Sequence, residues 1–149
     1  MKKLLAPALC ALGLGIGASF GAQALELSSP DFGNGFAITA YDPDAPTGSG
    51  WWHWVAYDLP ATLRNLPSGA GKAGAMPVGA KQGRNDYGGN EFGGACPPPG
   101  DKAHRYIFTV YALKVDKLEV PTDASAALIG YMLNANKQAT ATTLAMYGR

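Results

Sequence analysis

The stretch YDPDAPTGSGWWHW, residues 41–54, decides the fold and the site that this sequence predicts. Proline fixes φ and keeps the preceding residue out of the helical region, so Asp42 and Asp44 lie on stiff, extended backbone between prolines. A glycine-rich turn follows, and then an aromatic run that contains His53. The pattern indicates two strands joined by a tight connection, with carboxylates and an imidazole near the junction.

Three segments alternate between apolar and polar residues as strands do: 36–41, 51–57 and 104–113, the last reading HRYIFTVYAL. A period of two places His104 and Tyr106 on one face of their strand, together with Phe108 and Val110. The Gly- and Pro-rich residues 58–103 separate the second and third segments. So long a connection is typical of a functional loop, or it contains short strands.

After Pro121 the sequence pattern changes from one typical of strands to one typical of helices. Thr122 or Asp123 can cap a helix over residues 124–133, and a second helical stretch is predicted over 137–146. Strands that come first and helices that come last indicate a mainly β domain with C-terminal helices packed on it.

The N-terminal residues have the features of a secretory signal peptide. Lys2 and Lys3 precede an apolar, uncharged stretch, and Ala22-Gln23-Ala24 supplies a small-x-small cleavage pattern. Pro7 and several glycines interrupt the apolar stretch, which falls short of the ~20 residues that a membrane span needs. We therefore expect residues 1–24 to be a signal peptide cleaved after Ala24, residues 25–149 to form a single domain, and the protein to be periplasmic or secreted rather than membrane-spanning.

Charge and cysteine content narrow the classes of partner. The chain carries 12 basic and 11 acidic residues, and loss of Lys2 and Lys3 with the signal peptide changes the net charge from +1 to −1. This balance gives no electrostatic basis for binding nucleic acid or an anionic membrane surface. After cleavage only Cys96 remains, so we expect it to be unpaired within the mature chain and available for intermolecular disulfides.

The polar residues around the strands allow several kinds of chemistry. Asp42 and Asp44 suit a general acid–base pair, a metal site or simple turn capping. His53, surrounded by tryptophans, is either a pocket residue or a core histidine with a satisfied hydrogen bond. Cys96 and His104 include metal-ligand and nucleophile–base types, but neither a ligand spacing nor a helix N-terminus supports these roles. The sequence therefore predicts no metal, no cofactor and no catalytic residue.

In combination these motifs resemble the phosphatidylethanolamine-binding protein family, in its bacterial and archaeal Raf-kinase-inhibitor-like branch. The resemblance covers about Gly35 to Arg149, and its matching segments are DPDAP (42–46), GWWHW (50–54), RNDYG (84–88), GG (93–94) with CPPPG (96–100), and HRY (104–106). It implies a β-sandwich-like fold with C-terminal helices. It also implies a small pocket for phosphate-type anions or phospholipid head groups. Residue by residue, the pocket would consist of Asp42, His53, His104 and Tyr106, with Gly94 and Pro97 at its rim.

The chain departs from the family pattern in three places. Family members carry a longer segment where this chain has only Phe32–Gly35, with an early strand and a Gly-Cys loop that holds the expected partner of Cys96. Ala95 replaces a common proline, and Asp58 stands where asparagine is usual. We therefore expect the fold to lack an N-terminal segment. A missing strand predicts lower stability and a tendency to associate through an unpaired edge.

Three functions remain open at this stage. The first is an exported, non-enzymatic protein that binds a small anionic ligand. The second is a hydrolase that uses Asp42, His53 and His104 as acid–base groups. The third is an inhibitor that binds a protein partner outside the cytoplasm.

Overall fold

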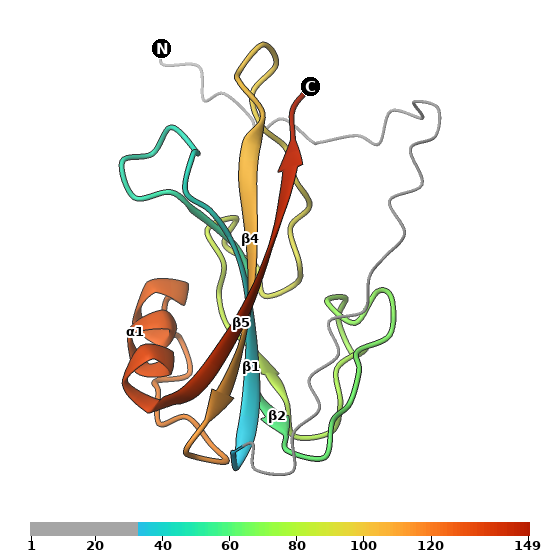
Figure 1. Ribbon diagram of the computed structural model, residues 1–149, viewed down its shortest axis with the longest axis vertical. Helices are drawn as coiled ribbons and strands as arrows, with labels where there is room; N and C mark the ends of the chain where they lie inside the picture. The colour runs from blue at the N-terminus through green and yellow to red at the C-terminus, as the bar shows by residue number, and fades with distance from the viewer. Residues whose placement is uncertain (1–32) are drawn as a thin grey trace, which may run out of the picture.

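The computed structural model describes residues 33–149 as one antiparallel sheet with a single helix (Figure 1). The strand order is β3-β2-β1-β4-β5, with β1 and β4 side by side in the middle of the sheet. The elements are β1 (Gly35–Asp42), β2 (Trp51–Pro60), β3 (Lys81–Gln82), β4 (His104–Leu113), α1 (Ala126–Asn136) and β5 (Lys137–Tyr147). The three strands expected from alternation are confirmed as β1, β2 and β4, whereas the expected signal peptide lies outside the described residues.

Helix α1 covers one face of the sheet (Figure 1). It is capped by Ser125, whose side chain accepts from the backbone N–H of Leu128, so the expected caps Thr122 and Asp123 were wrong by two or three residues. The helix buries Ile129 and Leu133 completely against a cluster that includes Val55 of β2. Each such side chain contributes about 1.5–3 kcal/mol by leaving water.

The expected second helix over residues 137–146 is wrong, because this segment is strand β5. It pairs with β4 from His104↔Tyr147 to Leu113↔Lys137. Alanine, leucine and methionine favour a helix locally, but Thr140, Thr142 and Thr143 are β-branched, and a long strand was available as a partner. β5 is an edge strand with Leu144, Met146 and Tyr147 exposed. It is thus the strand at which the association predicted from the short junction would occur.

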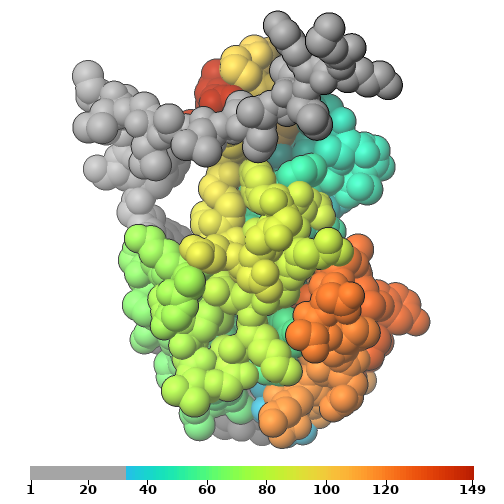
Figure 2. Space-filling view, turned by 180° about the vertical axis from the view of Figure 1, so that it is seen from behind, coloured from blue at the N-terminus to red at the C-terminus, as the bar shows by residue number. Residues whose placement is uncertain are grey.

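The opposite face of the sheet is covered in part by the connection between β2 and β3 (Figure 2). Leu63, Leu66 and Met76 of this connection pack against Phe36 and its neighbours. A cavity of about 600 Å³ remains between the connection and the sheet. Most of its lining consists of apolar side chains from the three long inner strands, from this connection and from the loop between β3 and β4: Phe36, Ile38, Trp54, Leu59, Leu66, Phe92, Phe108 and Val110.

β2 contains two irregularities that change which way its side chains face. At the first, Ala40 pairs with Trp54 but Tyr41 pairs with Trp52, so His53 is an extra residue, a β-bulge. The second lies near Asp58, which has φ +57°. Among side-chain-bearing residues, asparagine and aspartate adopt this left-handed conformation most readily. Asp58 is held there because it accepts from the backbone N–H of Leu118 and pairs with Lys81 at 3.0 Å.

Candidate functional site

The centre of the site is a buried pair formed by the last residue of β1 and the first residue of β4. His104 Nδ1 donates to Asp42 Oδ2 at 2.8 Å, and both side chains are almost fully buried. The other oxygen of Asp42 accepts from the backbone N–H groups of Asp44 and Ala45, at 2.8 and 3.1 Å. Asp42 therefore both closes the DPDAP turn and fixes the orientation of His104. The hydrogen bond that His104 donates to Asp42 raises the pKa of His104.

A second acidic residue faces His104 from the loop before β4. Asp101 Oδ2 lies 3.6 Å from Nε2, the ring nitrogen that does not contact Asp42. Asp101 is partly exposed, so it covers His104 from the solvent side. Asp44 points elsewhere: it forms a bidentate pair with Arg105, and these hydrogen bonds lower the pKa of Asp44 to about 2. Asp44 thus anchors the turn to β4 and does not enter the site.

His53 reaches the same face through the bulge in β2. Strict alternation would place His53 and Val55 on one face, but Val55 packs under the helix, whereas the His53 ring lies edge-on to Tyr106, with ring centres 5.2 Å apart. His53 Nδ1 donates to the backbone carbonyl of Gly93 at 2.8 Å. Burial lowers the pKa of His53, which favours a neutral imidazole.

Three buried polar atoms at this end of the sheet have no hydrogen-bond partner among the described residues: Trp51 Nε1, His53 Nε2 and the Tyr106 hydroxyl. The exposed fractions of His53 and Tyr106 are 3% and 5%. Burial raises the pKa of Tyr106 to about 12, so the hydroxyl keeps its proton. An unpaired buried polar group costs about 1–3 kcal/mol, and such groups in one place indicate a bound species that completes them.

The rim of the site comes from residues 84–94, within the long connection that precedes β4. Asn85 organises this loop: its side chain accepts from the backbone N–H groups of Tyr87 and Gly89 and donates to the carbonyl of Glu91. Tyr87 lies edge-on to His53 and donates to the carbonyl of Gly94 at 3.2 Å. A Cβ on Gly93 would lie 2.3 Å from the Tyr87 ring, so only glycine fits there.

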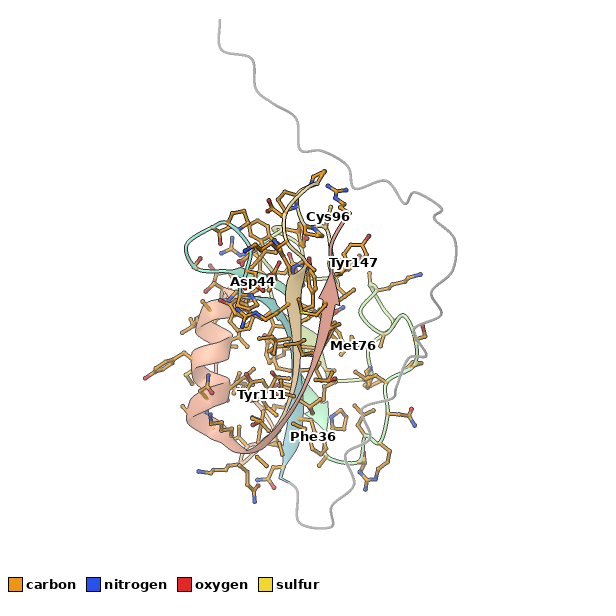
Figure 3. All side chains as sticks on the ribbon, turned by 45° about the horizontal axis from the view of Figure 1, so that its top comes forward. Phe36, Asp44, Met76, Cys96, Tyr111 and Tyr147 are labelled. Atoms are coloured by element: carbon orange, nitrogen blue, oxygen red, sulfur yellow. The ribbon has the colours of Figure 1, made fainter. Side chains whose placement is uncertain are left out.

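Pro97, the other expected rim residue, follows Cys96 in the loop between β3 and β4. Pro97 is buried, and its carbonyl accepts from Arg149 Nε at 2.7 Å. Cys96 is disulfide-bonded in the structure of the uncleaved chain. The expectation of an unpaired Cys96 concerns the mature chain after cleavage, and it stays a prediction. Figure 3 shows Cys96, Asp44 and Tyr147 toward one end of the sheet and Phe36 toward the other.

The sequence-predicted residues Asp42, His53, His104 and Tyr106 come together on one face at the end of the sheet. Sequence reasoning assigned no role to Tyr87 and Asp101, although Tyr87 belongs to the RNDYG segment that carried the resemblance. Within residues 33–149 no group of three or more His, Cys, Asp or Glu is placed to hold a metal ion. No helix in the same range is long and apolar enough to cross a membrane. None of the four central residues lines the apolar cavity described above, which is therefore a separate feature.

A sheet that is covered by a helix on one face and carries a compact His/Asp/Tyr cluster at one end defines a class of small ligand-binding β domain. Comparison with known proteins makes the class specific. The phosphatidylethanolamine-binding protein family profile matches residues 19–148, and the chain belongs to that family. The family binds small ligands, which agrees with a site built from unpaired polar groups.

Two relatives come from Escherichia coli K12. The UPF0098 protein YbcL is 57% identical over 120 residues, which cover 79% of this chain and 66% of YbcL. The UPF0098 protein YbhB is 50% identical over 113 residues, or 75% of this chain and 71% of YbhB. The chain thus spans only about two thirds of the length of these relatives.

Solved structures give the same result for the fold. The crystal structure of Escherichia coli YbcL, described as a new member of the mammalian PEBP family, superposes with a TM-score of 0.78 at 55% identity. The match covers 81% of this chain and 75% of that chain. A putative phosphatidylethanolamine-binding protein homologue from Chlamydia trachomatis superposes at 0.65 with 27% identity, over 80% of this chain and 75% of its own.

Proposed function

We propose that this protein binds a small anion of the phosphate or phospholipid head-group type, without catalysis, at the cluster of Asp42, His53, His104 and Tyr106. The observation that carries the proposal is the group of buried polar atoms without partners, Trp51 Nε1, His53 Nε2 and the Tyr106 hydroxyl. Two of the three are hydrogen-bond donors, as a site for anionic oxygens requires.

The electrostatics support an anion provided that His104 is protonated. Protonated His104 offers Nε2–H as a charge-assisted donor, and Asp42 stabilises that cation from the opposite side of the ring. The carboxylate of Asp42 is itself occupied by His104 and two backbone N–H groups, so it is directed away from a ligand at Nε2. Asp101 now lies beside Nε2, and an incoming anion would take the place of its carboxylate.

A non-catalytic role is supported by what surrounds the imidazoles. The two ring nitrogens of His104 contact the carboxylates of Asp42 and Asp101. Nδ1 of His53 contacts the Gly93 carbonyl and the Tyr87 hydroxyl, and its Nε2 has no partner among residues 33–149. Within residues 33–149 neither ring forms a hydrogen bond with a serine, threonine or cysteine side chain that could serve as a nucleophile. Hydrolysis of p-nitrophenyl phosphate above the rate of an Asp42→Asn, His104→Gln variant would contradict this part of the proposal.

The binding test follows the two imidazoles by NMR while phosphate or phosphoethanolamine is added. We expect the His104 and His53 signals to shift together with one saturation curve. Tyr106→Phe is the informative variant, because it removes only a hydroxyl that has no hydrogen-bond partner within residues 33–149. It should bind at least tenfold more weakly and be no less stable. If neither imidazole responds at millimolar anion, the proposed function is wrong.

Export is the second part of the proposal, and it is supported by the sequence alone. Lys2-Lys3, the apolar stretch and Ala22-Gln23-Ala24 predict cleavage after Ala24. The intact mass of the periplasmic or secreted protein should begin at Leu25. A mature species that retains Met1 in the cytoplasm would contradict export but leave the binding proposal unaffected.

A further inference from the structure

His53 differs from the other polar groups at the site because its free ring nitrogen accepts rather than donates. Nδ1 lies 2.8 Å from the carbonyl oxygen of Gly93, and a carbonyl can only accept, so the proton is on Nδ1. In the neutral ring Nε2 is then a lone-pair acceptor. This nitrogen is buried and has no partner among residues 33–149.

The other groups at the site donate. The indole of Trp51 has only an N–H to offer, and the Tyr106 hydroxyl keeps its proton because burial raises its pKa to about 12. His104 donates through Nε2 when it is protonated, since Nδ1 is already bonded to Asp42. The site therefore presents three donors and one acceptor.

From this arrangement we infer that the site selects an anion with its own O–H group, namely a phosphate monoester or inorganic phosphate in the singly protonated form. Three anionic or ester oxygens would accept from Trp51, Tyr106 and His104, while the P–OH group would donate to His53 Nε2. A phosphodiester has no P–OH group, and sulfate carries no proton near neutral pH. Either would leave Nε2 buried and unpaired, or would set its lone pair against an oxygen lone pair.

The charged and titratable groups that face His53 determine the pH range in which this selectivity holds. Asp42 approaches from β1, Asp86 and Tyr87 from the rim loop, and Tyr106 from β4. The two carboxylates favour a protonated ring, but burial is the larger effect and lowers the pKa of His53. His53 is therefore an acceptor near neutral pH, and strong acid would convert it to a donor and remove the selectivity.

This inference rests on the proposed function, and the test separates the two. Isothermal titration would compare methyl phosphate, dimethyl phosphate and sulfate at pH 6.5. We expect methyl phosphate to bind at least tenfold more tightly than the other two. Its affinity should fall as the pH rises above the second ionisation of the phosphate, near pH 6. Equal affinity for the three anions would overturn the inference but leave the proposed function standing, whereas no binding of any anion would overturn both.

Two variants and one spectrum assign the selectivity to His53. His53→Phe keeps an aromatic ring but removes the acceptor, so the ratio of methyl phosphate to dimethyl phosphate affinity should fall to near one. Tyr106→Phe removes a donor that all three anions use, so it should weaken all of them and leave the ratio unchanged. Because His53→Phe also loses the bond to Gly93, its folding must be checked. In the unchanged protein, the ¹⁵N shift of His53 Nε2 should be that of an unprotonated nitrogen, and a protonated value would overturn the inference directly.

Discussion

One face of the sheet is not covered by α1, and the two ends of that face are stabilised by different kinds of interaction. At one end Asp42, His53, His104 and Tyr106 are held by directed hydrogen bonds and ring contacts. At the other end Phe36 and its apolar neighbours surround a cavity of about 600 Å³. Directed bonds fix each side chain individually, whereas apolar packing constrains mainly volume and shape. The polar end should therefore respond to a change of single atoms, and the apolar end to a change of size.

The largest effect should follow removal of the Asp42 carboxylate. Asp42→Ala leaves His104 Nδ1 and two backbone N–H groups without acceptors in a buried place. We expect a loss of about 3–5 kcal/mol in the free energy of unfolding, measured by urea denaturation. This is as large as Leu59→Ala at the apolar end, for which about 2–5 kcal/mol is typical.

Asp42→Asn is the control, since its carbonyl oxygen can still close the DPDAP turn. It should cost less than Asp42→Ala. If Asp42→Ala lost under about 1 kcal/mol, the buried pair would not hold this end of the sheet together.

Two adjacent glycines at the rim test how tightly the polar end is packed. Gly93→Ala places a methyl group 2.3 Å from the Tyr87 ring, whereas a methyl group on Gly94 meets no atom of the described residues 33–149 within 4 Å. We expect Gly93→Ala to lose about 1–3 kcal/mol and to shift the Tyr87 fluorescence or NMR signals. Gly94→Ala should stay within about 0.5 kcal/mol of the unchanged protein. Equal effects of the two substitutions would show that the loop rearranges freely.

Valine-to-isoleucine substitutions on the two faces of the sheet test whether the cavity has room for a larger side chain. Val110 lines the cavity, whereas Val55 is fully buried under α1 and close to Gly83. Val110→Ile should gain up to about 0.8 kcal/mol by placing one methylene group in empty space. Val55→Ile should lose about 1–3 kcal/mol through overpacking. Thermal unfolding of the two variants decides the matter, and a loss at Val110 would mean that the cavity is closed in solution.

The smallest effect that we expect concerns how the free energy of unfolding depends on pH. The contributions of His104 and His53 should change with pH in opposite directions. The pKa of His104 is raised, so its contribution to stability is complete below its unfolded value of 6.5 and is lost as the pH rises through the folded value. The pKa of His53 is lowered, so its folded form loses stability as the pH falls below 6.5. The stability difference between the unchanged protein and His104→Gln should therefore grow from pH 9 to pH 6. The corresponding difference for His53→Gln should shrink from pH 7 to pH 5, and slopes of the same sign would contradict the assignment.

Sequence reasoning predicted the parts of the fold that depend on local pattern. The alternation in residues 104–113 placed His104 and Tyr106 on one face, and the motifs brought Asp42 and His53 into the same candidate site. The prediction was wrong or incomplete where pairing with a strand distant in sequence determines the structure. Residues 137–147 have a mixed local preference, and only pairing with β4 makes them a strand. The bulge that brings His53 onto the site face is a property of the β1–β2 pairing, which single-strand periodicity cannot contain.

The separation in sequence between Asp42 and His104 has a kinetic consequence. These residues lie 62 positions apart, and they come from two strands, β1 and β4, that pair only when the middle of the sheet forms. Such non-local pairing is slow, because a long loop must close before any contact compensates for its lost entropy. The Asp42–His104 pair therefore cannot form in a partly folded chain in which β1 and β4 are not yet paired. A ligand should protect the amides of β1 and β4 together in hydrogen exchange and slow global unfolding, rather than stabilise one loop.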